Sequence, residues 1–244
     1  MNAAKEARQQ VETGRATGVY IVSAPSGSGK TTLVDRLLHD VPHLHFSISY
    51  TTRPPRGPEQ HGREYCFLTR EQFQAMIAEG KLLEWAEVFG NFYGTAKRFL
   101  EEARQQGNDL LLDIDVQGEA QVKEKIPDAV SIFILPPSRA VLEYRLRKRG
   151  QDSDSVIARR LDRARSEICG YIRYDYVLIN EELEDTVERF RSIVLAERAK
   201  RGDLRGMEIS PDLLEHLRTL AESCQRERVA ERIGPILKSF GGNE

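Results

Sequence analysis

The sequence has few cysteines, no long apolar run and no strong excess of either charge. Its three cysteines, Cys66, Cys169 and Cys224, are far apart and form no CxxC pair. This pattern argues against a disulfide framework or a zinc site and fits a reducing cytoplasm. The polar N-terminal stretch has no apolar core for a signal peptide, and no run approaches the roughly 20 apolar residues that span a bilayer. We therefore expect a soluble, cytoplasmic protein with no membrane partner.

Charge and length narrow the functional classes further. The formal net charge is only −2, so the chain as a whole is not built to coat nucleic acid. Any anion that it binds must be held by local basic groups. At 244 residues the chain can bury a substantial core, as one large domain or as one domain with appendages.

Strands and helices alternate along most of the chain. A strand over 19–23 precedes a helix from about residue 30 to residue 39, and two later apolar runs, DLLLDIDVQG and AVSIFILPP, fit strands buried on both faces. This alternation predicts a parallel sheet with helices on both faces. Between residues 46 and 96 this alternation gives way to short β-like runs, which indicate an insertion that contacts substrate. After residue 206, one or two amphipathic helices follow outside the α/β pattern.

The first of these strands runs into a loop of small residues. The stretch APSGSGKT follows the P-loop pattern GxxxxGK[ST], with Ala24 in place of the first glycine. Small residues let successive backbone N–H groups turn inward around a phosphate, and the following helix presents its positive end to the same anion. Lys30 would reach the β- and γ-phosphates, and the Thr31 hydroxyl would bind Mg²⁺. The strand–loop–helix context favours a nucleoside triphosphate site over a flexible surface turn. Its predicted residues are Ala24, Pro25, Ser26, Gly27, Ser28, Gly29, Lys30, Thr31 and Thr32.

Two carboxylates follow a later strand. Asp113 and Asp115 lie two residues apart, so both point to the same side at its C-terminal end. Open α/β sheets bind ligands at that edge, and a carboxylate there can hold the water shell of a metal ion. The alternative is a solvated strand end.

Arginines form two further groups. Arg53 and Arg56 lie three residues apart in a proline-stiffened turn, where two guanidinium groups would suit a phosphate monoester. Charge runs on helices are usually solvated faces, but phosphoryl transfer needs positive charge around the migrating group. A second set of arginines can supply that charge, and it includes Arg145, Arg149 and Arg160.

In their order, these motifs resemble the guanylate kinase family. The resemblance is carried over about residues 18–201 by SAPSGSGKTT, FSISYTTRPPRG, HGREYCF, LLEWAEVFGNFYGT, LLLDIDVQG and RLRKRGQDS. It implies Mg²⁺-dependent phosphoryl transfer from ATP to GMP, and to dGMP, which gives ADP and GDP. It also implies an α/β fold in three parts: a P-loop NTPase core with a parallel sheet flanked by helices, a small β-rich GMP-binding domain and a helical lid.

The resemblance also implies domain bounds. It gives a core over 18–46, 97–140 and 174–205, a GMP-binding domain over 47–96 and a lid over 141–173. Residues 1–17 would form an N-terminal arm. The helical extension over 206–244 has no counterpart in the family pattern, so docking on the core, an oligomer interface and a partner site all stay open for it. The protein itself would be a monomer or a homo-oligomer.

Individual residues take roles by the same resemblance. The loop residues above would bind ATP, and the metal would lie near Thr31 and Asp113. The GMP phosphate would lie between Arg53, Arg56, Tyr65 and Tyr93, and Asp115 would contact GMP. The guanine would contact Ser49, Glu84 and Thr95. Charge on the transferred group would be stabilised by Lys30, Arg145, Arg149 and Arg160, with Arg159 as a register alternative to Arg160.

Hydrogen bonding explains the predicted guanine contacts. Guanine presents N1–H and an exocyclic amine side by side, so one carboxylate, Glu84, can accept from both. The hydroxyls of Ser49 and Thr95 can donate to O6 and N7. Adenine lacks this pair of donors, and sites built around hydrogen bonds reject such analogues by ~10⁴-fold or more. This argues against a kinase for another nucleoside monophosphate.

The predicted mechanism needs no covalent intermediate and no general base, because the attacking GMP phosphate oxygen is already anionic. Catalysis would consist of alignment and charge neutralisation, with lid closure excluding water. The alternative from another class is a scaffold module with a guanylate-kinase-like fold that binds phosphopeptides. Such modules typically have degraded P-loops, whereas Lys30 and Thr31 are present here. A separate role carried by the extension could coexist with catalysis.

Overall fold

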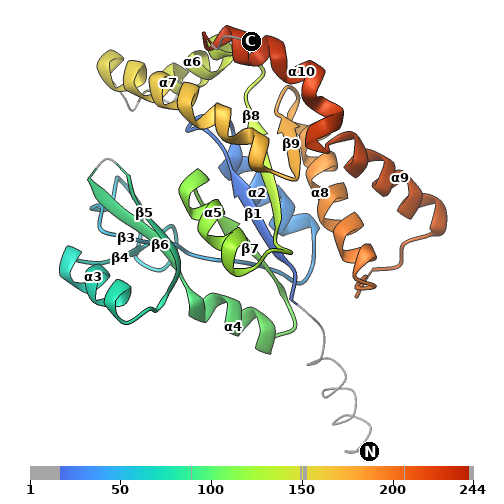
Figure 1. The fold of residues 1–244 in the computed structure, drawn as a ribbon, viewed down its shortest axis with the longest axis horizontal. Helices are drawn as coiled ribbons and strands as arrows, with labels where there is room; N and C mark the ends of the chain where they lie inside the picture. The colour runs from blue at the N-terminus through green and yellow to red at the C-terminus, as the bar shows by residue number, and fades with distance from the viewer. Residues whose placement is uncertain (1–16, 89, 149, 151–152, 206, 242–244) are drawn as a thin grey trace, which may run out of the picture. The chain divides into compact units, whose positions relative to one another are not determined.

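The computed structural model describes residues 17–88, 90–148, 150, 153–205 and 207–241 (Figure 1). They form two compact units, the first from the described residues of 17–21 and 43–129 and the second from those of 22–42 and 130–241. A five-stranded sheet has the order β2-β7-β1-β8-β9, and a four-stranded sheet has the order β4-β3-β6-β5. Among the described helices, none combines the length and apolar character that crossing a membrane would require.

The elements follow the expected alternation closely. The strands are β1 (Val19–Ser23), β2 (Leu44–Phe46), β3 (Tyr50–Thr51), β4 (Cys66–Phe67), β5 (Leu82–Val88), β6 (Asn91–Ala96), β7 (Asp109–Asp113), β8 (Val130–Leu135) and β9 (Tyr176–Ile179). The helices are α2 (Lys30–Asp40), α3 (Arg70–Ala78), α4 (Lys97–Gln105), α5 (Val116–Lys125), α6 (Arg139–Lys148), α7 (Asp154–Ile168), the 3₁₀ turn η1 (Cys169–Arg173), α8 (Leu183–Lys200), α9 (Pro211–Ser223) and α10 (Arg226–Ser239). The expectation of α/β structure with a parallel sheet is confirmed, since β2 pairs with β7 and β8 with β9 in parallel.

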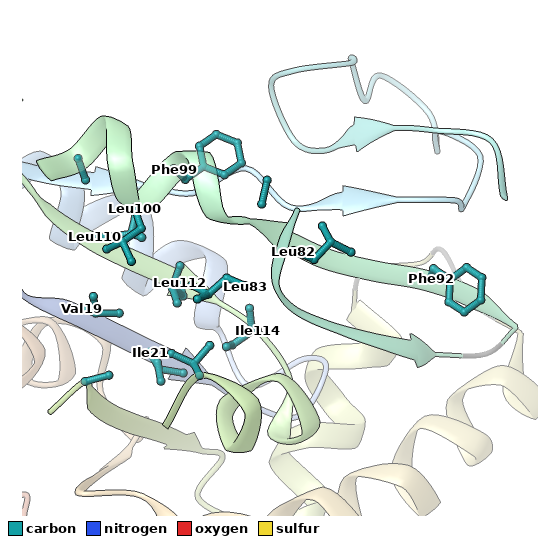
Figure 2. Close-up of a cluster of buried hydrophobic side chains, with 14 of the residues drawn as sticks. Val19, Ile21, Leu82, Leu83, Phe92, Phe99, Leu100, Leu110, Leu112 and Ile114 are labelled. Carbon is teal, nitrogen blue, oxygen red and sulfur yellow. The ribbon is translucent and has the colours of Figure 1, made fainter. Parts of the chain in front are cut away.

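The first unit holds the β-rich insertion. Strand β6 pairs antiparallel with both β3 and β5, and β4 pairs with β3. A capping box between Thr69 and Gln72 begins α3. Figure 2 shows the apolar cluster of this unit, which draws on β1, β5, β6, β7 and α4 and includes Val19, Ile21, Leu82, Leu83, Phe92, Phe99, Leu100, Leu110, Leu112 and Ile114. This cluster fixes β5 and β6, the two strands that carry most of the predicted guanine contacts.

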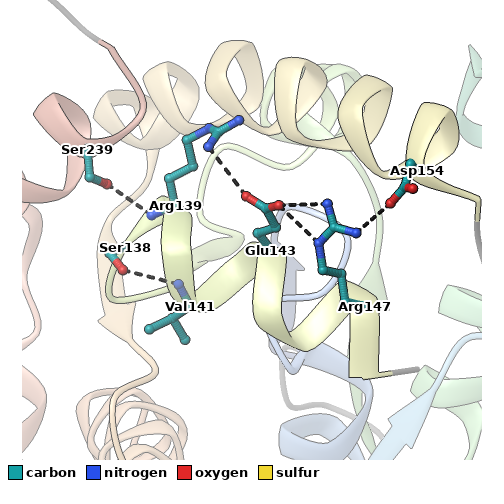
Figure 3. Close-up of polar contacts among 7 residues, drawn as sticks. All are labelled: Ser138, Arg139, Val141, Glu143, Arg147, Asp154 and Ser239. Atoms are coloured by element: carbon teal, nitrogen blue, oxygen red, sulfur yellow. Dashed lines mark hydrogen bonds and ion pairs between the residues drawn. The ribbon is translucent and has the colours of Figure 1, made fainter. Parts of the chain in front are cut away.

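The second unit holds the loop after β1 and the helices of the predicted lid. Helix α2 packs on α8, and α6 packs on α7. Figure 3 shows how ion pairs link the last two. Glu143 of α6 accepts from Arg139 and Arg147, and Arg147 also pairs with Asp154 of α7.

The C-terminal extension docks on the second unit. Helix α9 packs on α8, and the segment between α9 and α10 pairs with β9. The N–H of Val177 donates to the Cys224 carbonyl at 2.8 Å, and the N–H of Arg226 donates to the Asp175 carbonyl at 3.2 Å. The Arg139 N–H donates to Ser239 Oγ of α10 at 3.0 Å (Figure 3). Of the roles left open by the sequence, docking on the core is therefore the one that the fold displays, and it covers hydrogen-bonding groups of an edge strand.

Candidate functional site

The residues predicted to bind the triphosphate form a tight turn after β1. Every residue of β1 is buried, so the start of the loop is anchored in the interior. Within the phosphate loop (residues 24–29), the Ser28 N–H donates to the Pro25 carbonyl at 3.1 Å. Gly27 and Gly29 adopt φ values of 97° and 92°, in the left-handed region that side chains disfavour. The two glycines are thus required by backbone conformation.

The loop leads into a helix end suited to an anion. Helix α2 begins at Lys30, has no acidic residue in its first turn, and has no side-chain cap at Gly29. The first N–H groups of a helix have no intrahelical partner, and they carry the positive end of the helix dipole. The side chains of Thr31 and Thr32 are exposed. This end of α2 can therefore present N–H donors and a hydroxyl to a phosphate group.

Asn180, at the end of β9, holds the phosphate loop in place. Its Nδ2 donates to the Ser28 carbonyl at 2.7 Å, and a Cβ at Gly29 would lie only 2.4 Å from that nitrogen. Arg145 of α6 donates to the Ser28 carbonyl at 3.3 Å and to the Asn180 carbonyl at 3.0 Å. Burial lowers the pKa of Arg145, although an arginine keeps its charge. Sequence reasoning missed Asn180, and it expected Arg145 only near the transferred group.

The lid arginines differ in what they contact. Arg160 of α7 donates from Nη1 to Ser26 Oγ of the phosphate loop at 2.9 Å. Arg159 is exposed, and its Nε donates to the Ser155 carbonyl one turn back in the same helix. Of the two register alternatives, Arg160 is thus the residue that contacts the loop. Arg149 lies outside the described residues.

In the first unit, Glu84 is a buried carboxyl group with an unpaired oxygen. It lies on β5 opposite Thr95 of β6, and the two residues are 3% and 0% exposed. Among the described residues, Glu84 Oε1 and Thr95 Oγ1 have no hydrogen-bond partner. Burial raises the pKa of Glu84 to about 7, Thr95 opposes that rise in part, and Asp115 adds to it. Glu84 Oε1 can thus accept a hydrogen bond from a buried ligand, and the Thr95 hydroxyl can donate one to it.

Gly118 of α5 makes room for this carboxyl group. A Cβ at Gly118 would lie 2.5 Å from Glu84 Oε2, closer than any side chain can approach. This glycine lies in the DVQG stretch, and the sequence alone predicted no role for it. Asp115, predicted to contact GMP, accepts from the N–H groups of Gln117 and Gly118 and so caps α5. The cap orients both Asp115 and the helix turn beside Glu84.

The predicted phosphate-binding arginines lie in one turn but differ in exposure. Arg53 is 6% exposed, with its guanidinium carbon 5.2 Å from the centre of the Tyr65 ring, whereas Arg56 is exposed. Tyr65 meets Tyr93 edge to face at 6.0 Å between ring centres. The structure thus brings Arg53, Tyr65 and Tyr93 together. It also adds Glu59, an acid that sequence reasoning missed and that forms an ion pair with Arg53 at 2.9 Å.

Two further predicted residues lie in the same unit. Asp113 ends β7 and is half-buried. Burial, with the charge of Asp113 added to it, raises the pKa of Tyr65 to about 12. Tyr65 therefore stays protonated at neutral pH and can donate a hydrogen bond. Ser49 is half-buried just before β3, and its carbonyl accepts from the N–H of Cys66 at 2.9 Å.

Comparison with known proteins agrees with this chemistry. A family model described as guanylate kinase matches residues 16–197. The guanylate kinase of Koribacter versatilis is 55% identical over 91% of this chain and 95% of its own length, and that of Syntrophotalea carbinolica is 54% identical over 77% and 89%. The crystal structure of guanylate kinase from Anaplasma phagocytophilum superposes with a TM-score of 0.59 at 36% identity, over 78% of this chain and 89% of that one. The chain therefore belongs to the guanylate kinase family.

Proposed function

We propose that this protein transfers the γ-phosphoryl group of ATP to GMP or dGMP, with Mg²⁺, to give ADP and GDP or dGDP. The observation that carries the proposal is that Glu84 and Thr95, a buried acceptor and a buried hydroxyl, lie opposite each other on adjacent strands, with no partner for Oε1 or Oγ1 in the described part of the chain. Guanine supplies two adjacent N–H donors for the carboxylate. Adenine, cytosine and uracil do not present that pair, so Glu84 would stay unpaired with them.

The phosphate loop and α2 form the proposed ATP site. Backbone N–H groups at the start of α2 would hold the β- and γ-phosphates, and Lys30 would place its charge on them. Arg160 contacts the loop by a hydrogen bond to Ser26 Oγ, and it would stabilise charge on the transferred group. Arg145 would act mainly by holding the loop, since it bonds the carbonyl of Ser28.

The residues present fit Mg²⁺. The proposed ligands are Thr31, whose exposed hydroxyl lies in the first turn of α2, and Asp113, at the end of β7. Among the described residues no group of three or more His, Cys, Asp or Glu could hold a metal ion by itself. Mg²⁺ usually binds through one or two protein oxygens together with water and substrate phosphates, and the Thr31 hydroxyl and the Asp113 carboxylate are each oxygen donors of that kind. When bound, the ion supplies charge neutralisation at the phosphates.

The chain's own residues would act by positioning and charge. Arg53, Tyr65 and Tyr93 would hold the GMP phosphate, whose anionic oxygen attacks in line without a general base. Movement of α6 and α7 over ATP would exclude water and limit hydrolysis. A cytoplasmic location fits these substrates and the free cysteines.

The test is ADP release from ATP and Mg²⁺, with GMP, dGMP, AMP, CMP or UMP as the acceptor. We expect turnover with the two guanine nucleotides only. Glu84→Ala should raise the KM for GMP strongly. The matched control is Glu87→Ala, an exposed acid on the same strand. Folded wild-type protein that turns over no acceptor would refute the proposed reaction, and equal loss in both variants would refute the role of Glu84.

A further inference from the structure

We infer that Glu59 is a positioning residue that orients Arg53, together with the turn that carries Arg56, for the phosphate of GMP. The inference rests on the proposed function and deepens it. It assigns Glu59 no contact with substrate. Its carboxylate would act through the arginine that makes that contact.

The ion pair between Glu59 and Arg53 is bidentate. Nη1 of Arg53 donates to Glu59 Oε2 at 2.9 Å, and Nη2 donates to Oε1 at 3.0 Å. A third bond joins Nη1 to the Pro54 carbonyl at 2.8 Å. Two parallel bonds to a carboxylate fix both the position and the plane of a guanidinium group. Arg53 is therefore held in one orientation without any ligand.

The same carboxylate also fixes the backbone of the turn. The N–H of Arg56 donates to Glu59 Oε2 at 2.8 Å, so a single oxygen holds both the Arg53 side chain and the Arg56 main chain. The pKa of Glu59 lies below its ordinary value, chiefly because of the hydrogen bond from Arg53. The group is thus charged throughout the neutral range.

The bonds from Arg53 to Glu59 and Pro54 use only its Nη1 and Nη2 atoms. A guanidinium group carries five N–H donors, and Nε takes part in none of these three bonds. The Tyr65 ring lies beside this group, and the Tyr93 side chain interacts with it through charge and a hydrogen bond. Because Glu59 holds the Nη1–Nη2 edge, the phosphate would approach Arg53 from the side of Nε, beside Tyr65 and Tyr93. Ordering the arginine beforehand removes part of the entropy that GMP binding would otherwise lose.

The alternative to positioning is that Glu59 competes with the GMP phosphate for Arg53. A carboxylate that competes with phosphate for Arg53 would weaken GMP binding, and its removal would then tighten binding. Glu59→Gln separates the two cases because the amide keeps a similar shape but loses the charge and one of two acceptors. Glu59→Asp keeps the charge and shortens the reach, so it tests geometry.

The control is Glu64→Gln. Glu64 lies in the same turn region and has similar contacts, accepting from the Gln60 N–H at 2.8 Å and from Arg63 Nε at 2.5 Å. Neither of these partners belongs to the predicted GMP contacts. A general cost of removing a carboxylate from this loop would therefore appear in both variants.

The experiment measures kcat and the two KM values, with calorimetric binding of GMP and guanosine. We expect Glu59→Gln to weaken GMP by about 10- to 100-fold, with guanosine binding, the KM for ATP and kcat changed by less than about twofold. Glu59→Asp should lie between Glu59→Gln and wild type, and Glu64→Gln should match wild type. Unchanged or tighter GMP binding by Glu59→Gln, or equal weakening of guanosine, would overturn the inference. Wild-type protein that neither binds nor phosphorylates GMP would overturn the proposed function itself, and the inference with it.

Discussion

Glu84→Gln should make the ligand-free protein more stable, by an amount that grows with pH. The pKa of Glu84 rises from an ordinary value of 4.5 to about 7, chiefly because of burial. Each unit of difference between the folded and unfolded pKa corresponds to about 1.36 kcal/mol, so ionised Glu84 costs the folded state about 3 kcal/mol. Glutamine carries no charge and avoids this cost.

The sign follows from proton counting. Below pH 4.5 the carboxyl group is protonated in both states, so it contributes no pH dependence. Between pH 4.5 and about 7 the folded state keeps a proton that the unfolded state has lost, and stability falls as pH rises. Above about pH 7 the loss is complete. The stability difference between Glu84→Gln and wild type should therefore grow by about 3 kcal/mol across that window.

Urea unfolding of both proteins at a series of pH values measures this difference directly. Other titrating groups are common to both proteins and cancel in the comparison. The same variant should bind GMP more weakly than wild type at pH 8, because an amide places one acceptor oxygen and one N–H donor group where a carboxylate places two acceptor oxygens. A stability difference that does not change with pH would refute the argument that Glu84 is desolvated.

Three further substitutions test other parts of the structure. Gly29→Ala would place a Cβ 2.4 Å from Asn180 Nδ2 at a φ of 92°, so urea unfolding should show a loss of at least about 1 kcal/mol and kinetics a higher KM for ATP. Wild-type values for both would contradict the geometry of the phosphate loop. Gly118→Ala would crowd Glu84 Oε2 at 2.5 Å and should raise the KM for GMP without raising that for ATP; equal rises would indicate general disruption. Ile233→Ala, fully buried in α10, should lower the free energy of unfolding by about 2–5 kcal/mol, and no loss would contradict docking of the extension.

The phosphate loop could be predicted from the sequence because its chemistry is local. The turn, the positive φ values and the helix start lie within consecutive residues, so the spacing of Gly27, Gly29 and Lys30 specifies them. The strands and helices of the α/β pattern were predictable for a similar reason. Apolar periodicity and chain punctuation determine them before any distant contact is formed.

Contacts between distant segments were not predictable in this way. Asn180 donates to the Ser28 carbonyl across 152 positions, and nothing in YVLIN marks that asparagine as a partner of the loop. Arg159 and Arg160 are adjacent on a helix, so the choice between them depends on how α7 is rotated. The amphipathic pattern of the extension indicated an apolar face, but the surface that this face covers belongs to the fold.

Glu84 shows why a predicted contact and its energetics are separate questions. The family pattern suggested that this acid contacts guanine. The free-energy cost of ionising it in the empty site becomes visible only in the structure, where Glu84 is buried, Gly118 lies against Oε2, and Oε1 has no partner among the described residues. Thr95 offsets only part of the desolvation of this group, so a ligand that donates to Glu84 Oε1 compensates more of it. A ligand with two adjacent N–H donors relieves most of that cost, and a base with an acceptor at the same place adds repulsion. Selectivity for guanine then follows from the energy of the empty site as much as from contacts in the complex.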